Sequence, residues 1–265
     1  MEINGAYSWG SLEEKRGNNP LLPKSIRGLI IGKSNCGKTN LLMNLLLQHG
    51  WLDYNHLYVF GQSLHQTEYQ VLKKAFEMSL SKEQIANLFA NQHLVKKQGL
   101  SPMDILNAYN GECNGKIKAD FFSDCTVIPD PSDLDKNEKN LLILDDCILG
   151  PQNKAEAYYT RGRHSNCDTF YISQNYFRLP RRSVRENANF FIIFPQDNKN
   201  LSHIHADHCG DDMNLNEFRK FCGSVWNEAE YSFVVIDLTS KKLNGKYRKN
   251  LDTFYIPTEE SSSSK

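Results

Sequence analysis

The string Gly32-Lys33-Ser34-Asn35-Cys36-Gly37-Lys38-Thr39 constrains this chain more than any other part of its sequence. It matches the pattern G-x-x-x-x-G-K-[ST]. An apolar run, residues 28–31, stands directly before it, and residues 40–47 after it carry leucines at helical spacing. A strand, a glycine-rich turn and a helix in this order direct backbone N–H groups and the positive end of the helix dipole at one point. The sequence therefore predicts an α/β fold with a site for nucleotide phosphates at the end of a strand.

The residues of this loop have separate predicted tasks. Gly32 and Gly37 permit the tight backbone path. Lys38 is expected to reach the β- and γ-phosphates, and the Thr39 hydroxyl is expected to ligate Mg²⁺. A glycine-rich turn that binds nothing is the alternative, but the flanking strand and helix favour the phosphate site. The residues expected to bind ATP are Gly32, Lys33, Ser34, Asn35, Cys36, Gly37, Lys38, Thr39 and Asn40.

A second apolar run, residues 141–144, ends in the carboxylate pair Asp145-Asp146. This is the form of a Walker B element. Asp145 is expected to hold Mg²⁺ through its water shell, and Asp146 to polarise the water that attacks the γ-phosphate. The alternative for such a pair is a turn or a helix cap.

The next apolar run, residues 169–172, is followed by Ser173 and Gln174. This places a polar amide at the carboxyl edge of the sheet, where sites of α/β folds open. Gln174 is therefore a candidate sensor that hydrogen-bonds the γ-phosphate or the attacking water, with a solvated loop residue as the alternative.

Arginines gather on both sides of this run. Arg163 precedes it, and Arg185 follows it within the segment 178–185. An arginine offered to the γ-phosphate of an adjacent subunit stabilises the charge of the transition state, so both are candidate arginine fingers. A surface salt bridge is the alternative for each, and the sequence does not rank the two.

A group of histidines and cysteines raises the question of zinc. His203, His205, His208 and Cys209 lie close together, with Cys222 further on. The spacing H-x-H-x-x-H-C matches no strong structural zinc pattern, and no second cysteine pair is present. We expect these side chains to serve packing or helix capping.

The chain is expected to divide into three parts. Residues 1–25 are read as an irregular N-terminal arm, residues 26–258 as one P-loop domain, and residues 259–265 as a disordered low-complexity tail. Residues 94–139 have no strong strand pattern and are expected to form a surface insertion. Further helices are predicted at 67–78, 82–90 and 102–109, strands at 56–60 and 190–194, and an antiparallel hairpin of residues 232–238 and 246–255 around Asn244-Gly245.

Composition excludes several classes of protein. The longest apolar runs fall far below the roughly 18 residues of a membrane span, and the first residues do not resemble a secretory signal, so an intracellular protein without a membrane anchor is expected. Seven scattered cysteines, an odd number, favour reduced thiols over a disulfide framework. Because 31 basic side chains balance 31 acidic ones, the chain does not coat nucleic acid by bulk charge. A DNA channel would depend on local cations such as Lys96, Lys97, Arg181 and Arg182.

Five motifs follow one another in this chain: the phosphate loop, Leu-Ile-Leu-Asp-Asp, Arg-Gly-Arg-His, Ile-Ser-Gln and the stretch Leu-Pro-x3-Val-Arg-Glu-Asn. In this order of motifs, residues 25 to 200 resemble the poxvirus-type genome-packaging ATPases of the FtsK/HerA group. Members occur in large double-stranded DNA viruses, virophages and Polinton-like elements. Bacterial pumps of the wider group usually carry Asp-Glu where this chain has Asp145-Asp146, as in the viral branch.

The resemblance implies a RecA-like P-loop NTPase core, with a mainly parallel central sheet flanked by helices and a C-terminal antiparallel hairpin. It implies Mg²⁺-ATP, a homo-oligomeric ring of five or six subunits, and translocation of double-stranded DNA into a capsid with capsid or portal proteins as partners. It also implies a place at the virus assembly site, in the host cytoplasm or nucleus, or in the virion. Phosphate binding by Gly37, Lys38 and Thr39, Mg²⁺ binding by Asp145, water activation by Asp146 and sensing by Gln174 agree with it.

Two other functions remain open at this point. One is a P-loop nucleotide or small-molecule kinase that holds a phosphoryl acceptor in the insertion and works without a ring. The other is a capsid or replication protein that binds ATP as a switch and hydrolyses it poorly.

Overall fold

The structure is a computed structural model that describes residues 17–91, 97 and 99–257. Residues 1–16 of the expected arm, Lys96 and the expected tail lie outside the described residues. In the described part of the chain, the strands form one nine-stranded sheet in the order β3-β2-β4-β5-β1-β6-β7-β8-β9. The strands are β1 (Arg27–Ile31), β2 (His56–Gly61), β3 (Lys118–Phe122), β4 (Asn140–Asp145), β5 (Cys167–Ser173), β6 (Phe190–Ile193), β7 (Val234–Asp237), β8 (Tyr247–Lys249) and β9 (Thr253–Tyr255).

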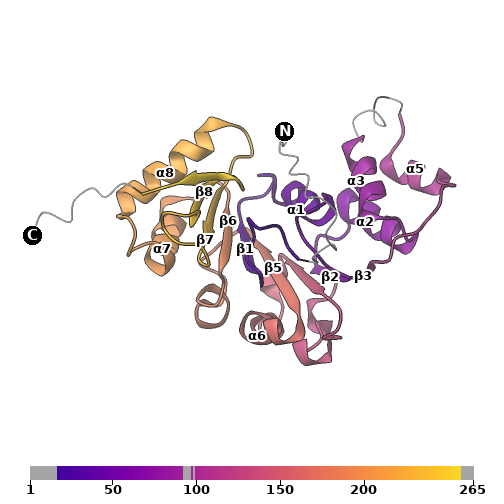
Figure 1. Ribbon diagram of the computed structural model, residues 1–265, viewed down its shortest axis with the longest axis horizontal. Helices are drawn as coiled ribbons and strands as arrows, with labels where there is room; N and C mark the ends of the chain where they lie inside the picture. Colours follow the sequence, from indigo (N-terminus) through magenta and orange to yellow (C-terminus); the bar gives the residue numbers. More distant parts are fainter. Residues whose placement is uncertain (1–16, 92–96, 98, 258–265) are drawn as a thin grey trace, which may run out of the picture.

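Strand β1, which leads into the phosphate loop, lies in the middle of this sheet between β5 and β6 (Figure 1). The strands from β3 to β6 in the sheet order are parallel, and β7, β8 and β9 continue the sheet in antiparallel pairing. The predicted fold class, a mainly parallel sheet with a C-terminal antiparallel addition, is confirmed. Because the parallel strands end at one edge, the loops after β1, β4 and β5 meet there.

Helices cover both faces of the sheet, which is why the central strands are apolar along their whole length. Leu29 and Ile31 of β1 pack into a core shared with α6, α7 and α8, whereas Ile30 packs into a core shared with α1, α2 and α3. Figure 1 shows α2 and α3 beside the half of the sheet with β2 and β3, and α7 and α8 beside the half with β7 and β8. The helices are α1 (Lys38–Leu47), α2 (Thr67–Glu77), α3 (Lys82–Ala90), α5 (Pro102–Ala108), α6 (Asn153–Arg161), α7 (Asn198–His208) and α8 (Leu215–Glu228).

Local sequence signals placed several of these elements. At α3, the Ser81 hydroxyl accepts a hydrogen bond from the Gln84 backbone N–H, and the Gln84 side chain accepts one from the Ser81 N–H, as a capping box requires. In the C-terminal hairpin, Gly245 has a φ of 90°, a value that glycine adopts without strain. A second turn at Asn250, with a φ of 53°, divides the expected second arm into β8 and β9.

Residues 94–139, which show no strong strand pattern in the sequence and are read as a surface insertion, nevertheless contain a strand. Strand β3, Lys118–Phe122, lies within this segment and pairs in parallel with β2 at the edge of the sheet. Its residues alternate between exposed and half-buried, because β3 lies at the edge of the sheet and none of its side chains is fully buried. The apolar pattern was therefore too weak to reveal it.

The described end of the arm is tied to the core. The Asn18 side-chain amide donates a 2.7 Å hydrogen bond to Asp168, and Leu22 is buried. Within the described residues, no helix has both the length and the apolar character needed to cross a membrane.

Candidate active site

The phosphate loop follows β1 and leads into α1, and two glycines make its path possible. Gly37 has a φ of 99°, in the left-handed region that favours glycine. At Gly32 the reason is space, because a Cβ there would lie 2.4 Å from the Cys36 sulfur and 2.7 Å from Cβ of Phe194. The loop is therefore folded tightly against the end of β6.

The Lys38 ammonium group lies across the mouth of this loop. It donates hydrogen bonds to the carbonyl oxygens of Gly32, at 2.7 Å, and Lys33, at 2.6 Å. Gly32 is buried at the end of β1, whereas Lys33 is exposed. The positive charge is thus held at the place where the loop closes.

A cavity of about 450 Å³ opens beside the loop at the carboxyl edge of the sheet. It brings together residues from the phosphate loop, the acid pair, the sensor strand and the first turn of α2. Its lining is Ser34, Asn35, Gly37, Lys38, Thr39, Asn40, Ser63, Gln66, Glu68, Asp145, Asp146, Ile172, Ser173, Gln174 and Tyr231. Among the described residues predicted for the site, Gly32, Lys33, Cys36, Arg163 and Arg185 are outside this lining.

Asp145, the last residue of β4, is a buried carboxylate with 7% of its surface exposed. The hydroxyl of Tyr69, on α2, donates a 2.6 Å hydrogen bond to its Oδ2. Burial raises the pKa of Asp145 above its ordinary value, and the neighbouring Asp146 acts in the same direction, whereas the Tyr69 bond and the Lys38 charge oppose the rise. Sequence reasoning missed Tyr69, because a single tyrosine within a predicted helix carries no local signal of this contact.

Asp146 and Gln174 lie within hydrogen-bonding reach of each other at the mouth of the cavity. The Gln174 amide donates to Asp146 Oδ2 at 3.4 Å, and its oxygen accepts a bond of 3.3 Å from the Ser34 hydroxyl. A chain of contacts thus runs from the phosphate loop through the sensor strand to the acid pair. Asp146 itself has a φ of 53°, which turns the backbone sharply after β4.

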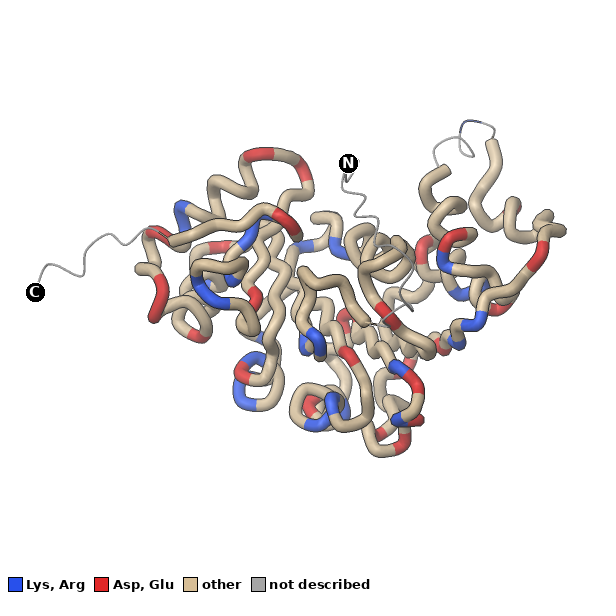
Figure 2. The backbone as a smooth tube through the Cα atoms, in the orientation of Figure 1, with Lys and Arg blue, Asp and Glu red and all other residues tan. Residues whose placement is uncertain are grey.

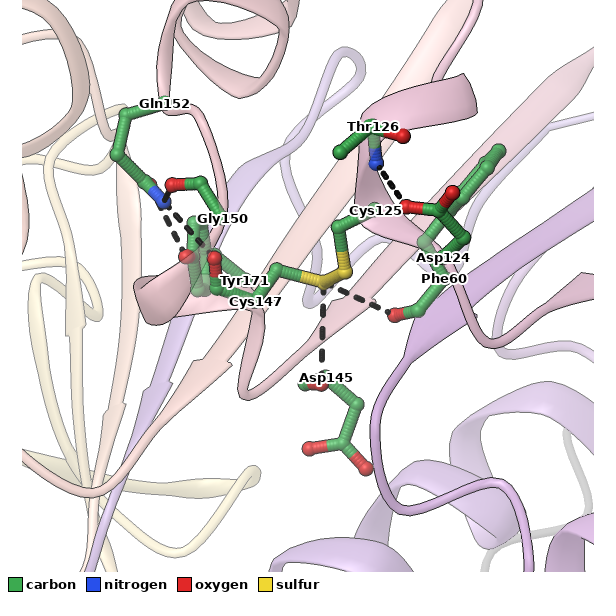
Figure 3. Close-up of a disulfide and its surroundings, with 9 residues drawn as sticks. All are labelled: Phe60, Asp124, Cys125, Thr126, Asp145, Cys147, Gly150, Gln152 and Tyr171. Atoms are coloured by element: carbon green, nitrogen blue, oxygen red, sulfur yellow. Dashed lines mark hydrogen bonds between the residues drawn. A yellow bond between two sulfur atoms is a disulfide. The ribbon is translucent and has the colours of Figure 1, made fainter.

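The cysteine expectation is wrong for one pair. Cys125, within the expected insertion, and Cys147, directly after the acid pair, form a disulfide with a Cα–Cα distance of 6.1 Å (Figure 3). The count and spacing of cysteines do not reveal a pair that only the packed loops bring together. Among the described residues, the free cysteines are Cys36, Cys113, Cys167, Cys209 and Cys222.

This disulfide fixes the turn that follows the acid pair. The Cys147 sulfur lies 3.3 Å from the carbonyl oxygen of Phe60 and 3.8 Å from that of Asp145. On the other side of the turn, the Gln152 amide donates 2.8 Å hydrogen bonds to the carbonyl oxygens of Cys147 and Gly150 (Figure 3). The segment after Asp145-Asp146 is therefore held from both sides.

The two candidate finger arginines occupy different surroundings. Arg163 is exposed in a short helical turn, Gly162–Ser165, directly before β5. Burial is the main cause that lowers the pKa of Arg27 at the start of β1, and the charge of Arg163 adds to this effect. Arg163 therefore lies at the edge of the sheet opposite the cavity. Arg185 is only 5% exposed, pairs with Asp207 at 3.2 Å and lies over the Tyr176 ring. The Arg185 guanidinium is thus paired with a carboxylate of its own subunit.

The histidines near the C-terminal end of α7 have separate neighbours. His203 stacks on Phe177, His205 lies 2.7 Å from the carbonyl oxygen of Met213, and His208 lies 2.8 Å from the Tyr176 hydroxyl. The part of the chain that the structure describes includes no group of three His, Cys, Asp or Glu side chains placed to hold a metal ion.

The fold is similar to that of solved structures of the genome packaging NTPase B204 from Sulfolobus turreted icosahedral virus 2. The complex with ATP-gammaS is 13% identical, with a TM-score of 0.50, over 85% of this chain and 96% of that chain. The complex with sulfate is 11% identical, with a TM-score of 0.51, over 88% of this chain and 98% of that chain. No family model and no curated protein matches the chain. The likeness is one of fold, and at that level the resemblance seen in the sequence is confirmed.

Proposed function

We propose that the chain is an ATPase that drives double-stranded DNA into a viral capsid. The observation that carries the proposal is the cavity in which the phosphate loop, Asp145, Asp146 and Gln174 converge. Lys38 and the loop N–H groups bind the β- and γ-phosphates, with the ammonium exchanging its bonds to Gly32 and Lys33 for phosphate oxygens.

The residues at the floor of the cavity fit a Mg²⁺ ion. A hydroxyl from Thr39 and a buried carboxylate from Asp145 line the same space, and oxygen is the ligand atom that Mg²⁺ prefers. The ion would neutralise phosphate charge when bound. Asp145 is suited to hold it through water, because one carboxylate oxygen is already fixed by Tyr69.

Asp146 and Gln174 act on the attacking water. Asp146 accepts its proton, and Gln174, bonded to both Asp146 and Ser34, orients it relative to the γ-phosphate. Loss of the γ-phosphate would change the contacts of Gln174, and the loop that follows it would carry that change outward.

Coupling to DNA rests on the fold shared with B204, a genome packaging NTPase. Basic and acidic residues are interspersed along the described chain (Figure 2), so we place the DNA contact on local exposed cations, with Arg181 and Arg182 as the leading ones. We infer a homo-oligomeric ring in which Arg163, facing away from its own cavity, completes the site of a neighbour. Capsid or portal proteins are the expected partners at the virus assembly site in the host cell.

Steady-state ATP hydrolysis with and without duplex DNA tests this function. We expect stimulation by DNA of any sequence that weakens steeply with salt, and no turnover in Lys38→Ala. Lys73→Ala is the control, because Lys73 is an exposed lysine of α2 that lies outside the cavity lining. Turnover that requires a small phosphoryl acceptor would indicate a kinase, and tight ATP binding with negligible turnover under all conditions would indicate a switch.

A further inference from the structure

Tyr231 is an exposed aromatic residue at the nucleotide cavity. It lies in the loop between α8 and β7, lines the cavity and has 57% of its surface exposed. Its backbone has a φ of 65°, a region where a bulky residue is uncommon. A large ring kept in water on a left-handed backbone contributes little to the core, and nothing in the sequence singled it out.

The ring of Tyr231 lies against the phosphate loop. A Cβ placed on Gly37 would be 3.2 Å from Cδ1 of Tyr231 and 3.4 Å from its Cβ. The tyrosine is therefore within contact distance of the loop at the residue that precedes Lys38. This places the ring beside the loop that is expected to bind the phosphates.

The order of the strands places different residues on the two sides of the cavity. On one side of β1 stand β5 and then β4, which supply Gln174 and Asp145. On the other side stand β6 and then β7, and the loop that enters β7 supplies Tyr231. A triphosphate that lies over the loop with its γ-phosphate toward Asp145 and Gln174 must extend its nucleoside toward the opposite side, where the Tyr231 ring is.

We propose that Tyr231 is the base-binding residue of this site, its ring stacking on the nucleobase of the bound nucleotide. The inference rests on the proposed function, because it assumes that the triphosphate lies in this orientation. Stacking on an exposed aromatic ring supplies affinity through the π-face that every base has. Tyr231 thus acts on binding of the nucleoside, while the phosphate groups and the acid pair act on hydrolysis.

Equilibrium binding of ATP and of tripolyphosphate, which lacks the nucleoside, separates these two contributions. In Tyr231→Ala we expect the dissociation constant for ATP to rise about tenfold or more, with that for tripolyphosphate unchanged. Tyr231→Phe keeps the ring and should bind ATP as the wild type does. Phe254→Ala is a matched control, since Phe254 is an exposed aromatic residue, 48% accessible, outside the cavity lining.

Two results would overturn the inference and leave the proposed function standing. One is unchanged ATP affinity in Tyr231→Ala. The other is an equal loss of affinity for ATP and tripolyphosphate, which would mean that Tyr231 only shapes the phosphate loop. If the wild-type protein bound neither compound, the nucleotide site itself would be wrong, and the inference would fail with it.

Discussion

The hydroxyl of Tyr69 donates a 2.6 Å hydrogen bond to the carboxylate of Asp145. Both groups are buried, so the bond fixes the orientation of an acid that has little solvent to stabilise its charge. It also links α2 to the end of β4. A movement of α2 would therefore change the environment of the carboxylate that we assign to Mg²⁺.

Tyr69→Phe should weaken Mg²⁺-dependent turnover about tenfold with the fold intact, since a hydrogen bond to a charged group contributes roughly 1.5–3 kcal/mol. The bond opposes the raised pKa of Asp145, so its loss raises that pKa further. The acidic limb of the profile of kcat/KM against pH should then move to higher pH. Tyr54→Phe is the control, because the buried Tyr54 hydroxyl donates to Leu46 away from the cavity.

Asp146→Asn should retain ATP binding and lose hydrolysis by about 10²-fold or more, because the amide keeps the size of the side chain and removes the base. Nucleotide titration and single-turnover hydrolysis measure the two effects separately. Glu68 also lines the cavity, from the first turn of α2. Should Asp146→Asn retain turnover while Glu68→Gln loses it, the base is Glu68.

Arg163→Ala should leave stability unchanged and slow hydrolysis about 10³-fold if this arginine completes a neighbouring site. Mixing that inactive protein with inactive Lys38→Ala should restore some turnover, because some interfaces then pair an intact loop with an intact arginine. Arg185→Ala should instead cost about 3 kcal/mol of stability, since it removes the cation that pairs with Asp207 and leaves that carboxylate only its hydrogen bond from Tyr176. Failure of the Arg163 mixture, with mixed oligomers demonstrated, would refute the finger assignment.

Reduction of the Cys125–Cys147 disulfide should lower the free energy of unfolding by about 3 kcal/mol, the chain-entropy value for a loop of this length. Chemical denaturation with and without a thiol reductant measures the change. The double variant Cys125→Ser, Cys147→Ser should be insensitive to the reductant. Cys113→Ser, which removes an exposed free thiol, should remain as sensitive as the wild type.

Burial lowers the pKa of His208 from 6.5 to about 4, with Arg185 adding to the effect and Asp207 opposing it. Between these values the unfolded chain binds a proton that the folded protein does not, so stability falls as pH drops from 6.5 toward 4. His208→Gln should remove up to about 3 kcal/mol of this decline. Unfolding free energies at pH 7.5 and 4.5 provide the comparison, and an equal decline in both proteins would contradict it.

The parts of the fold that could be predicted from sequence are those with a local signal. The phosphate loop, the capping box at Ser81 and the turn at Gly245 each depend on neighbouring residues, and apolar runs located the central strands. Strand β3 was not predicted, because the apolar pattern of this edge strand is weak.

The contacts that could not be predicted join residues far apart in the chain. Tyr69 meets Asp145, Cys125 meets Cys147, and Arg185 meets Asp207 only after the strands have been ordered in the sheet. Nothing in the composition around any of these residues specifies its partner. The sequence could therefore identify the chemistry of the site, but not the side chains that orient it.

The central place of β1 in the sheet also sets the order in which this protein can assemble during synthesis. Leu29 and Ile30 leave the ribosome early, yet the strands that flank them, residues 167–173 and 190–193, follow much later. Until then these apolar residues have no neighbours in the sheet, which makes the growing chain slow to fold and prone to aggregate. A nascent chain that stops before Cys167 thus carries the complete phosphate-binding string without either of the strands that flank β1 in the sheet.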